Sequence, residues 1–192
     1  MIRRLYDWTM SLACHPRAMW ALAAVAFIES SVFPIPPDVL MIPMVLAARE
    51  KAWKIAFVAT IASVLGGCLG YAIGYGFMDT LGMAILEFYG KASAFDDLAA
   101  RFNAYGGWAV LVAGVTPFPY KVITIFSGAT HLDPLLFIGV SVLARALRFF
   151  VVAGLLWRFG APIRDFIERW LGLLFTAFVV LLIGGFYALR YL

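Results

Sequence analysis

Five ionisable side chains lie inside apolar runs that are long enough to enter a membrane: Glu29, Asp38, Lys121, Arg145 and Arg148. A charge in the hydrocarbon of a bilayer is costly, so such residues are expected to pair and to mark a path for an ion or a substrate. Arg145 and Arg148 are three residues apart, so they share one helix face, which we expect to point inward. With three basic and two acidic members, the set is positive overall, and the free N–H groups of broken helices also attract anions. An anionic headgroup therefore suits this set.

Two interpretations of these charges stay open. In the first they line a polar cavity, and in the second they only hold the helices of a bundle together. Asp38 and Lys121 are expected to approach each other, and Glu29 is expected to meet Arg145 or Arg148. Five such groups in combination with two broken helices favour the cavity.

Prolines break two of the apolar runs at their centres. FPIPPDVL at 33–40 aligns with TPFPYKVI at 116–123, so each run holds a Pro-x-Pro-x-charge element. Each break leaves two arms of about 10–14 residues, which at ~1.5 Å per residue cross only half of a bilayer. We therefore predict two re-entrant hairpins, at 18–48 and 108–131, with two proline-kinked full spans as the alternative. The predicted tips hold Pro34, Pro36, Pro37, Pro117 and Pro119.

The other segments complete an all-α integral membrane protein. Apolar side chains recur at helical spacing through 80–103, opposite charged ones, which predicts an interfacial amphipathic helix. Glycines 66, 70 and 74 predict a close-packing helix face. We expect one membrane domain over 1–192, built as two inverted repeats of re-entrant hairpin plus transmembrane helix. In order, its elements are an N-terminal amphipathic helix (1–17), hairpin 1 (18–48), a transmembrane helix (55–78), the interfacial helix (80–103), hairpin 2 (108–131), and transmembrane helices at 134–157 and 170–190.

Composition and charge agree with a membrane protein. Of 192 residues, 64% are hydrophobic and 14% are charged, whereas soluble domains are roughly half apolar. The net charge is +4, but the basic residues gather at the edges of apolar runs, so nucleic-acid binding is not expected. Three of the 15 Lys and Arg residues lie inside the apolar runs. If both broken runs are hairpins, nine of the other 12 lie on the same side of the membrane as the N-terminus. Because basic residues are enriched on the cytoplasmic side, this places the N-terminus in the cytoplasm.

The sequence holds no arrangement that is typical of catalysis or metal binding. Cys14 and Cys68 lack a Cys-x-x-Cys spacing. No nucleophile stands with a base and an orienting partner, and there is no phosphate loop. We therefore expect no enzyme activity, metal or other cofactor. Membrane lipids are the expected partners, and a homo-oligomer stays open.

The first hairpin resembles that of the DedA family, also described as the SNARE-associated or VTT-domain family. In that family a glutamate is followed by prolines and a second acid. In FIESSVFPIPPDVL, Glu29, Pro34, Pro36 and Asp38 match this pattern position by position.

The second hairpin departs from the family. The family carries two arginines around a Pro-Gly there, whereas GVTPFPYKV has no arginine and offers Lys121. Arg145 and Arg148, from the next apolar run, are then expected to supply positive charge. This difference leaves the substrate open.

The resemblance implies a multi-pass protein of the bacterial inner membrane. It implies a protein that helps lipids such as undecaprenyl phosphate or phospholipids to cross the bilayer, in some members with dependence on the proton gradient. The first functional hypothesis is thus a lipid flippase or scramblase in which Glu29 and Asp38 gate the path or carry a proton. Its phosphate ligands would be Lys121, Arg145 and Arg148. A proton-coupled transporter of a small solute or an ion, and a non-transporting scaffold for membrane homeostasis, are the alternatives.

Overall fold

The computed structural model describes residues 17–32, 36–116 and 118–160. Residues 1–16 of the predicted N-terminal helix (1–17), the predicted helix at 170–190, and the tip residues Pro34 and Pro117 lie outside the described residues. Every regular element within them is helical, which confirms the all-α class for this part of the chain. The elements are α2 (Ala18–Ser31), α3 (Asp38–Ala47), the 3-10 helix η1 (Arg49–Lys51), α4 (Ala52–Phe77), the π-helical turn η2 (Met78–Gly82), α5 (Met83–Phe88), α6 (Ala92–Val115), α7 (Tyr120–Ala129) and α8 (Pro134–Phe159).

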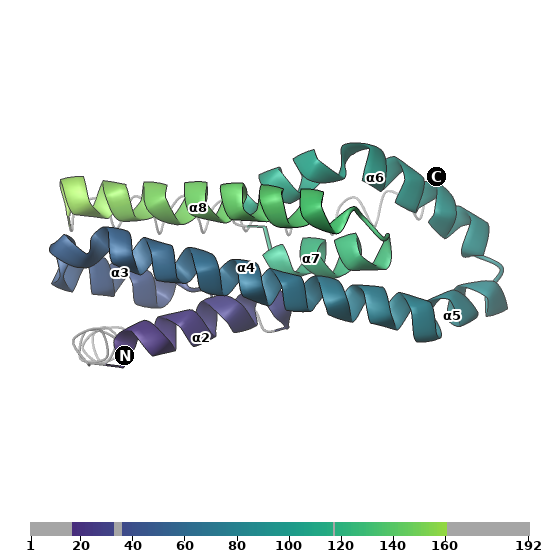
Figure 1. Ribbon diagram of the computed structural model, residues 1–192, viewed down its shortest axis with the longest axis horizontal. Helices are drawn as coiled ribbons and strands as arrows, with labels where there is room; N and C mark the ends of the chain where they lie inside the picture. Colours follow the sequence, from purple (N-terminus) through teal and green to yellow (C-terminus); the bar gives the residue numbers. More distant parts are fainter. Residues whose placement is uncertain (1–16, 33–35, 117, 161–192) are drawn as a thin grey trace, which may run out of the picture.

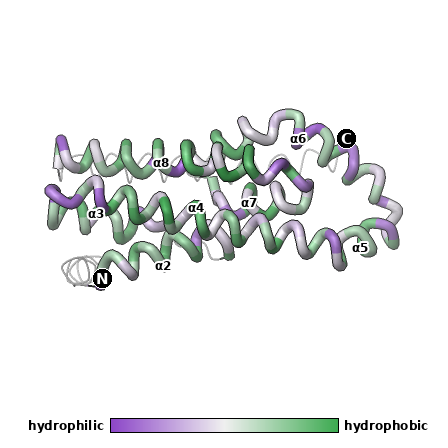
Figure 2. Tube along the Cα trace, viewed as in Figure 1, coloured by the Kyte–Doolittle hydropathy of each residue, from purple (hydrophilic) through white to green (hydrophobic). Residues whose placement is uncertain are grey.

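Within the part of the chain that the structure describes, two helical stretches are long and apolar enough to cross a membrane. They are Arg49–Phe88, with 40 residues, and Pro134–Phe159, with 26 residues. Figure 2 shows apolar residues along α4 and α8, whereas hydrophilic residues are frequent along α5 and the start of α6. Large apolar side chains such as Leu135, Leu143 and Phe57 face outward, as expected where lipid surrounds a helix.

The other helices form two pairs, α2–α3 and α6–α7, that enter from opposite ends of the molecule (Figure 1). α2 runs from one end toward the middle, and α3 returns toward that end. α6 runs from the other end toward the middle, and α7 returns. The ends of α2 and α6 and the starts of α3 and α7 therefore lie near the middle of the bundle. We call the two places where one helix of a pair gives way to the other the chain breaks.

The long helices hold these pairs together. α4 packs against α2, α7 and α8, and α8 packs in addition against α6 and α3. α4 thus contacts the first helix of the α2–α3 pair, which precedes it, and the second helix of the α6–α7 pair. In the same way, α8 contacts the first helix of the α6–α7 pair, which precedes it, and the second helix of the α2–α3 pair. Two apolar cores result, one around Leu22, Met41 and Phe149 and one around Tyr120 and Phe137.

The glycine face predicted on α4 is confirmed as a close contact between backbones. A Cβ atom at Gly66 would lie 2.1 Å from the Phe27 carbonyl oxygen of α2. A Cβ atom at Gly74 would lie 1.9 Å from the Ile125 carbonyl oxygen of α7. Both arms that pack on α4 therefore need a residue without a side chain at these positions.

This contact predicts the effect of adding one methyl group to α4. Gly74→Ala is expected to lower the free energy of unfolding by about 1–3 kcal/mol, because overpacking forces the backbones of α4 and α7 apart. The measurement is the thermal unfolding midpoint of the purified protein in detergent. Gly76→Ala is the matched control, since no atom lies within 4 Å of a Cβ atom there. Equal midpoints for the two variants would contradict the close contact.

The stretch 80–103 is two helical segments and not the single helix that the periodicity predicts. α5 ends at Phe88, and α6 begins at Ala92 and continues to Val115. Gly90 between them adopts φ +63°, a left-handed conformation that ends a helix and that glycine adopts without strain. The charged stretch after the turn is therefore continuous with the first arm of the second pair. Its placement on a membrane surface stays a prediction.

Candidate functional site

Four of the five predicted charges meet in two ion pairs on one face of α8. The Arg145 Nη2 atom lies 2.9 Å from Glu29 Oε2 of α2, and the Arg148 Nη2 atom lies 2.7 Å from Asp38 Oδ2 of α3. Because the two arginines are three residues apart, α8 presents both to the short helices. Of the two partners expected for Glu29, the structure selects Arg145.

Hydrogen bonds through two serines surround the Glu29–Arg145 pair. Arg145 Nε donates to Ser63 Oγ at 2.5 Å, and Ser63 Oγ lies 2.7 Å from Ser30 Oγ. Ser30 Oγ in turn lies 3.1 Å from Glu29 Oε2, to which it donates. When Ser63 donates to Ser30, these bonds form a closed circuit through α2, α4 and α8. Only 1% of the Arg145 side chain is exposed.

Aromatic rings enclose the Arg145 guanidinium as well. Its Cζ atom lies 4.7 Å from the ring centres of both Tyr120, on α7, and Phe149, on α8. Such contacts stabilise a cation, more so where water is excluded. The Tyr120 hydroxyl donates to Ser141 Oγ at 2.5 Å, which fixes its ring. Arg145 therefore connects α2, α4, α7 and α8.

The Asp38–Arg148 pair lies where the two chain breaks meet. Asp38 is the first residue of α3, where a negative charge suits the positive end of the helix dipole. Arg148 Nη1 donates at 2.6 Å to the Thr116 carbonyl, which follows the last residue of α6. The side chains of Asp38 and Arg148 are 6% and 10% exposed. Arg148 thus joins the start of α3 to the end of α6.

This pair also contains polar atoms that the described residues leave without a partner. Asp38 Oδ1 and Arg148 Nε are both buried, and no described protein group bonds to either. Neither Glu29 nor Arg145 contributes such an atom. Buried polar groups in native proteins are almost always hydrogen-bonded, so each exception calls for an explanation such as a bound water, an ion, a ligand or a functional role.

Lys121 does not pair with Asp38, and that expectation is wrong for the described structure. The Lys121 Nζ atom donates to the Val32 carbonyl at 3.1 Å, at the end of α2. Carbonyls in the last turn of a helix lack partners within the helix and attract cations, which accounts for this choice. Thr124 Oγ1 also donates to the Ser30 carbonyl at 3.0 Å. The second break therefore contacts the first at the end of α2.

The predicted tip prolines that lie within the described residues stand at or just before helix starts. Pro37 directly precedes α3, and Pro119 directly precedes α7. A proline at such a position leaves no hydrogen bond unmade, because the first N–H groups of a helix have no partner within the helix. Pro36 lies one residue earlier, and its carbonyl accepts from Val39 N at 3.2 Å. These prolines set where the second arms begin.

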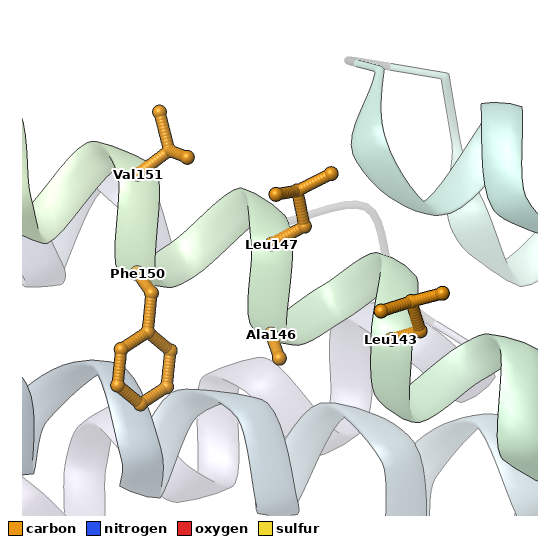
Figure 3. Close-up of a pocket in the computed structure, with 5 residues that line it drawn as sticks. All are labelled: Leu143, Ala146, Leu147, Phe150 and Val151. Carbon is orange, nitrogen blue, oxygen red and sulfur yellow. The ribbon is translucent and has the colours of Figure 1, made fainter.

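The opposite face of α8 is apolar. A shallow pocket of about 370 Å³ lies there, lined by Leu143, Ala146, Leu147, Phe150 and Val151 (Figure 3). In this view Phe150 points toward α4, and Leu147 and Val151 point away from it. The charged side chains of α8 therefore point into the helix bundle, and apolar side chains cover its opposite face.

Together, the apolar helices, the two helix pairs and the buried ion pairs are the features of a helical membrane protein. The family model described as the VTT domain matches residues 35–158, and the chain belongs to this family, the DedA family of membrane proteins. The matched range holds Asp38, Lys121 and both arginines, and Glu29 lies before it. The family membership that the sequence predicted is thus confirmed.

Two relatives carry the similarity along most of the chain. An uncharacterized protein of Haemophilus influenzae is 39% identical over 168 residues, which cover 85% of this chain and 87% of that protein. An uncharacterized protein of Histophilus somni is 38% identical over the same length and with the same coverage. No solved structure matches the chain.

Proposed function

We propose that this protein moves an anionic lipid, undecaprenyl phosphate or a phospholipid, across the bacterial inner membrane as a flippase or scramblase. The observation that carries this proposal is the Asp38–Arg148 pair, a buried ion pair that joins the start of α3 to the end of α6 and whose arginine has a donor without a partner among the described residues. Guanidinium groups suit phosphate because their donors match its oxygens. Membership of the VTT-domain family supports membrane transport.

The membrane arrangement is part of the proposal. α4 and α8 would span the bilayer, whereas the α2–α3 and α6–α7 pairs would be re-entrant hairpins from opposite sides, with the N-terminus in the cytoplasm. α2 and α3 have 14 and 10 residues, so they reach only about 21 and 15 Å at ~1.5 Å per residue, less than a core of ~30 Å. The packing of each long helix on arms of both pairs supports an inverted repeat.

The headgroup and the tails of the lipid would follow different surfaces. Arg148 and Lys121 would contact the phosphate where the two breaks meet, because both reach that point from different helices. Asp38 would gate this contact. The tails would stay in the bilayer beside apolar surfaces such as the outer face of α8. Irregular backbone at this depth is tolerated where protein or water covers it, as at these breaks.

The Glu29–Arg145 pair favours a second candidate, a non-transporting scaffold. Arg145 Nε and Nη2 both bond to protein groups, and the pair joins helices without a buried polar atom that lacks a partner among the described residues. A protein in which every buried charge acted this way would only organise the membrane around it. The two candidates differ in whether lipid moves.

Lipid movement can be measured in vesicles that contain the purified full-length protein. Phosphatidic acid with a fluorescent acyl chain is incorporated, and dithionite then bleaches the outer leaflet. We expect bleaching of both leaflets with the wild-type protein and of one leaflet in protein-free vesicles. Encapsulated inorganic phosphate is expected to stay inside, which separates lipid transport from solute transport. Bleaching of one leaflet with the wild-type protein would contradict the proposal and favour the scaffold.

A further inference from the structure

The two buried ion pairs use their arginines differently. A guanidinium offers parallel N–H donors along the edge formed by Nε and one Nη atom, which can hold two oxygens at once. In Arg145 both atoms of this edge are occupied, Nε by Ser63 and Nη2 by Glu29. Of the same two atoms in Arg148, Nη2 donates to Asp38 Oδ2, and Nε has no partner among the described residues.

The Asp38 carboxylate is equally incomplete. Its Oδ1 atom is buried and lacks a partner from the described protein, so the pair makes one hydrogen bond where two fit. The guanidinium itself is held in place from its other side, since Nη1 donates to the Thr116 carbonyl. Arg148 is therefore held in place and presents two donors, Nε and Nη2, along one edge, and the Asp38 carboxylate binds only the Nη2 donor.

We propose that Asp38–Arg148 is an exchangeable pair, in which the phosphate group of an anionic ligand displaces Asp38 from Arg148, and that Glu29–Arg145 stays paired throughout. This rests on the proposed function, of which it names the working arginine. A phosphate presents three oxygens and fills both donors of the Nε–Nη2 edge, which Asp38 does not. The displaced carboxylate remains at the first turn of α3, where free N–H groups stabilise its charge.

Arg145 is unsuited to the same exchange. Its edge is bonded to Ser63 and Glu29, and Tyr120 and Phe149 lie near its guanidinium. An anion would have to break the circuit that links α2, α4 and α8 before it reached a donor. The structure thus assigns a positioning role to Arg145 and a ligand-binding role to Arg148.

Calorimetric titration of the full-length protein in detergent tests this assignment. The probes are inorganic phosphate and the short-chain lipid dihexanoyl phosphatidic acid. Asp38→Asn removes the competing charge and is expected to tighten binding at least about tenfold, whereas Glu29→Gln is expected to leave it unchanged. Arg148→Gln is expected to abolish binding. Equal tightening by Glu29→Gln, unchanged affinity in Asp38→Asn, or no binding of either probe would overturn the exchange.

A measurement on the wild-type protein covers the case in which a variant fails to fold. Phenylglyoxal modifies accessible guanidinium groups, and mass spectrometry locates the product. We expect phosphate to protect Arg148 from modification and to leave Arg145 unmodified under all conditions. Protection of Arg145 instead, or no protection of Arg148, would overturn the assignment.

The source of the phosphate group and the proposed function are tested separately. Tighter binding of the lipid than of inorganic phosphate identifies a headgroup, and equal binding identifies the phosphate group alone; both agree with exchange at Arg148. If vesicles show lipid movement but Asp38→Asn does not tighten binding, the exchange is wrong and transport stands. If binding tightens as expected and no lipid moves, transport is wrong and the exchange stands.

Discussion

Replacement of Glu29 by glutamine is expected to destabilise the protein by about 3–5 kcal/mol, the loss that follows when one partner of a buried ion pair is removed. Arg145 is 1% exposed and stays charged, so its guanidinium would keep only hydrogen bonds to neutral groups. Glutamine has almost the volume of glutamate, so packing changes little. The measurement is the free energy of unfolding of the purified protein in mixed detergent micelles.

Two further variants separate charge from packing. The double variant Glu29→Gln with Arg145→Met removes both charges and is expected to recover most of the lost stability, because a neutral pair needs no counter-charge. Ser63→Ala removes only one hydrogen bond to Arg145 and is expected to cost less than Glu29→Gln. A Glu29→Gln protein as stable as the wild type would show that Arg145 does not depend on this acid.

The sequence predicted the helical class and the regions of the breaks because each rests on a local and strong physical signal. Long apolar runs without a proline at their centres became α4 and α8, and the proline clusters end α2 and begin α3 and α7. The turn at Gly90 was not predicted. Glycine inside an amphipathic pattern is often tolerated in a helix, and only its positive φ shows that the chain turns there.

The five charges were identified by depth alone, because a charge in an apolar run needs a partner. Their pairing was not fully predictable. Asp38 and Lys121 hold equivalent places in two similar elements, but equivalent residues of a repeat meet only when they lie near the axis that relates the two copies. The direction of each side chain decides its partner. The Asp38 side chain pairs with Arg148, and the Lys121 side chain donates to the Val32 carbonyl.

The neutral members of the site gave weaker signals. Ser30 and Ser63 complete the circuit around Arg145, but a single serine in an apolar helix has no spacing that sets it apart. Ser63 does lie three residues before Gly66, on the face of α4 that packs against α2. A small polar residue on a close-packing face is a usable signal for a bond between membrane helices.

Neutralising the Asp38–Arg148 pair as a whole is expected to leave the protein folded and to stop lipid movement. In the double variant Asp38→Asn with Arg148→Gln no buried charge is left without a partner, so the loss of about 3–5 kcal/mol that follows when one partner of a buried ion pair is removed does not arise. We expect the free energy of unfolding to change by less than about 1 kcal/mol. Lipid movement is expected to fall at least about tenfold, because the donor edge that binds the phosphate is gone.

The matched control is the corresponding double variant at the other pair, Glu29→Gln with Arg145→Gln. It likewise removes one acid and one arginine, and its arginine lies on the same face of α8, one turn away, but the donor edge of that arginine is already filled by protein groups. If that pair only positions the helices, the refolded double variant should retain most of the lipid movement in the vesicle assay. Equal loss of movement in both double variants, with both proteins folded, would show that phosphate depends on the two arginines alike, and the division between a positioning pair and an exchangeable pair would then be wrong.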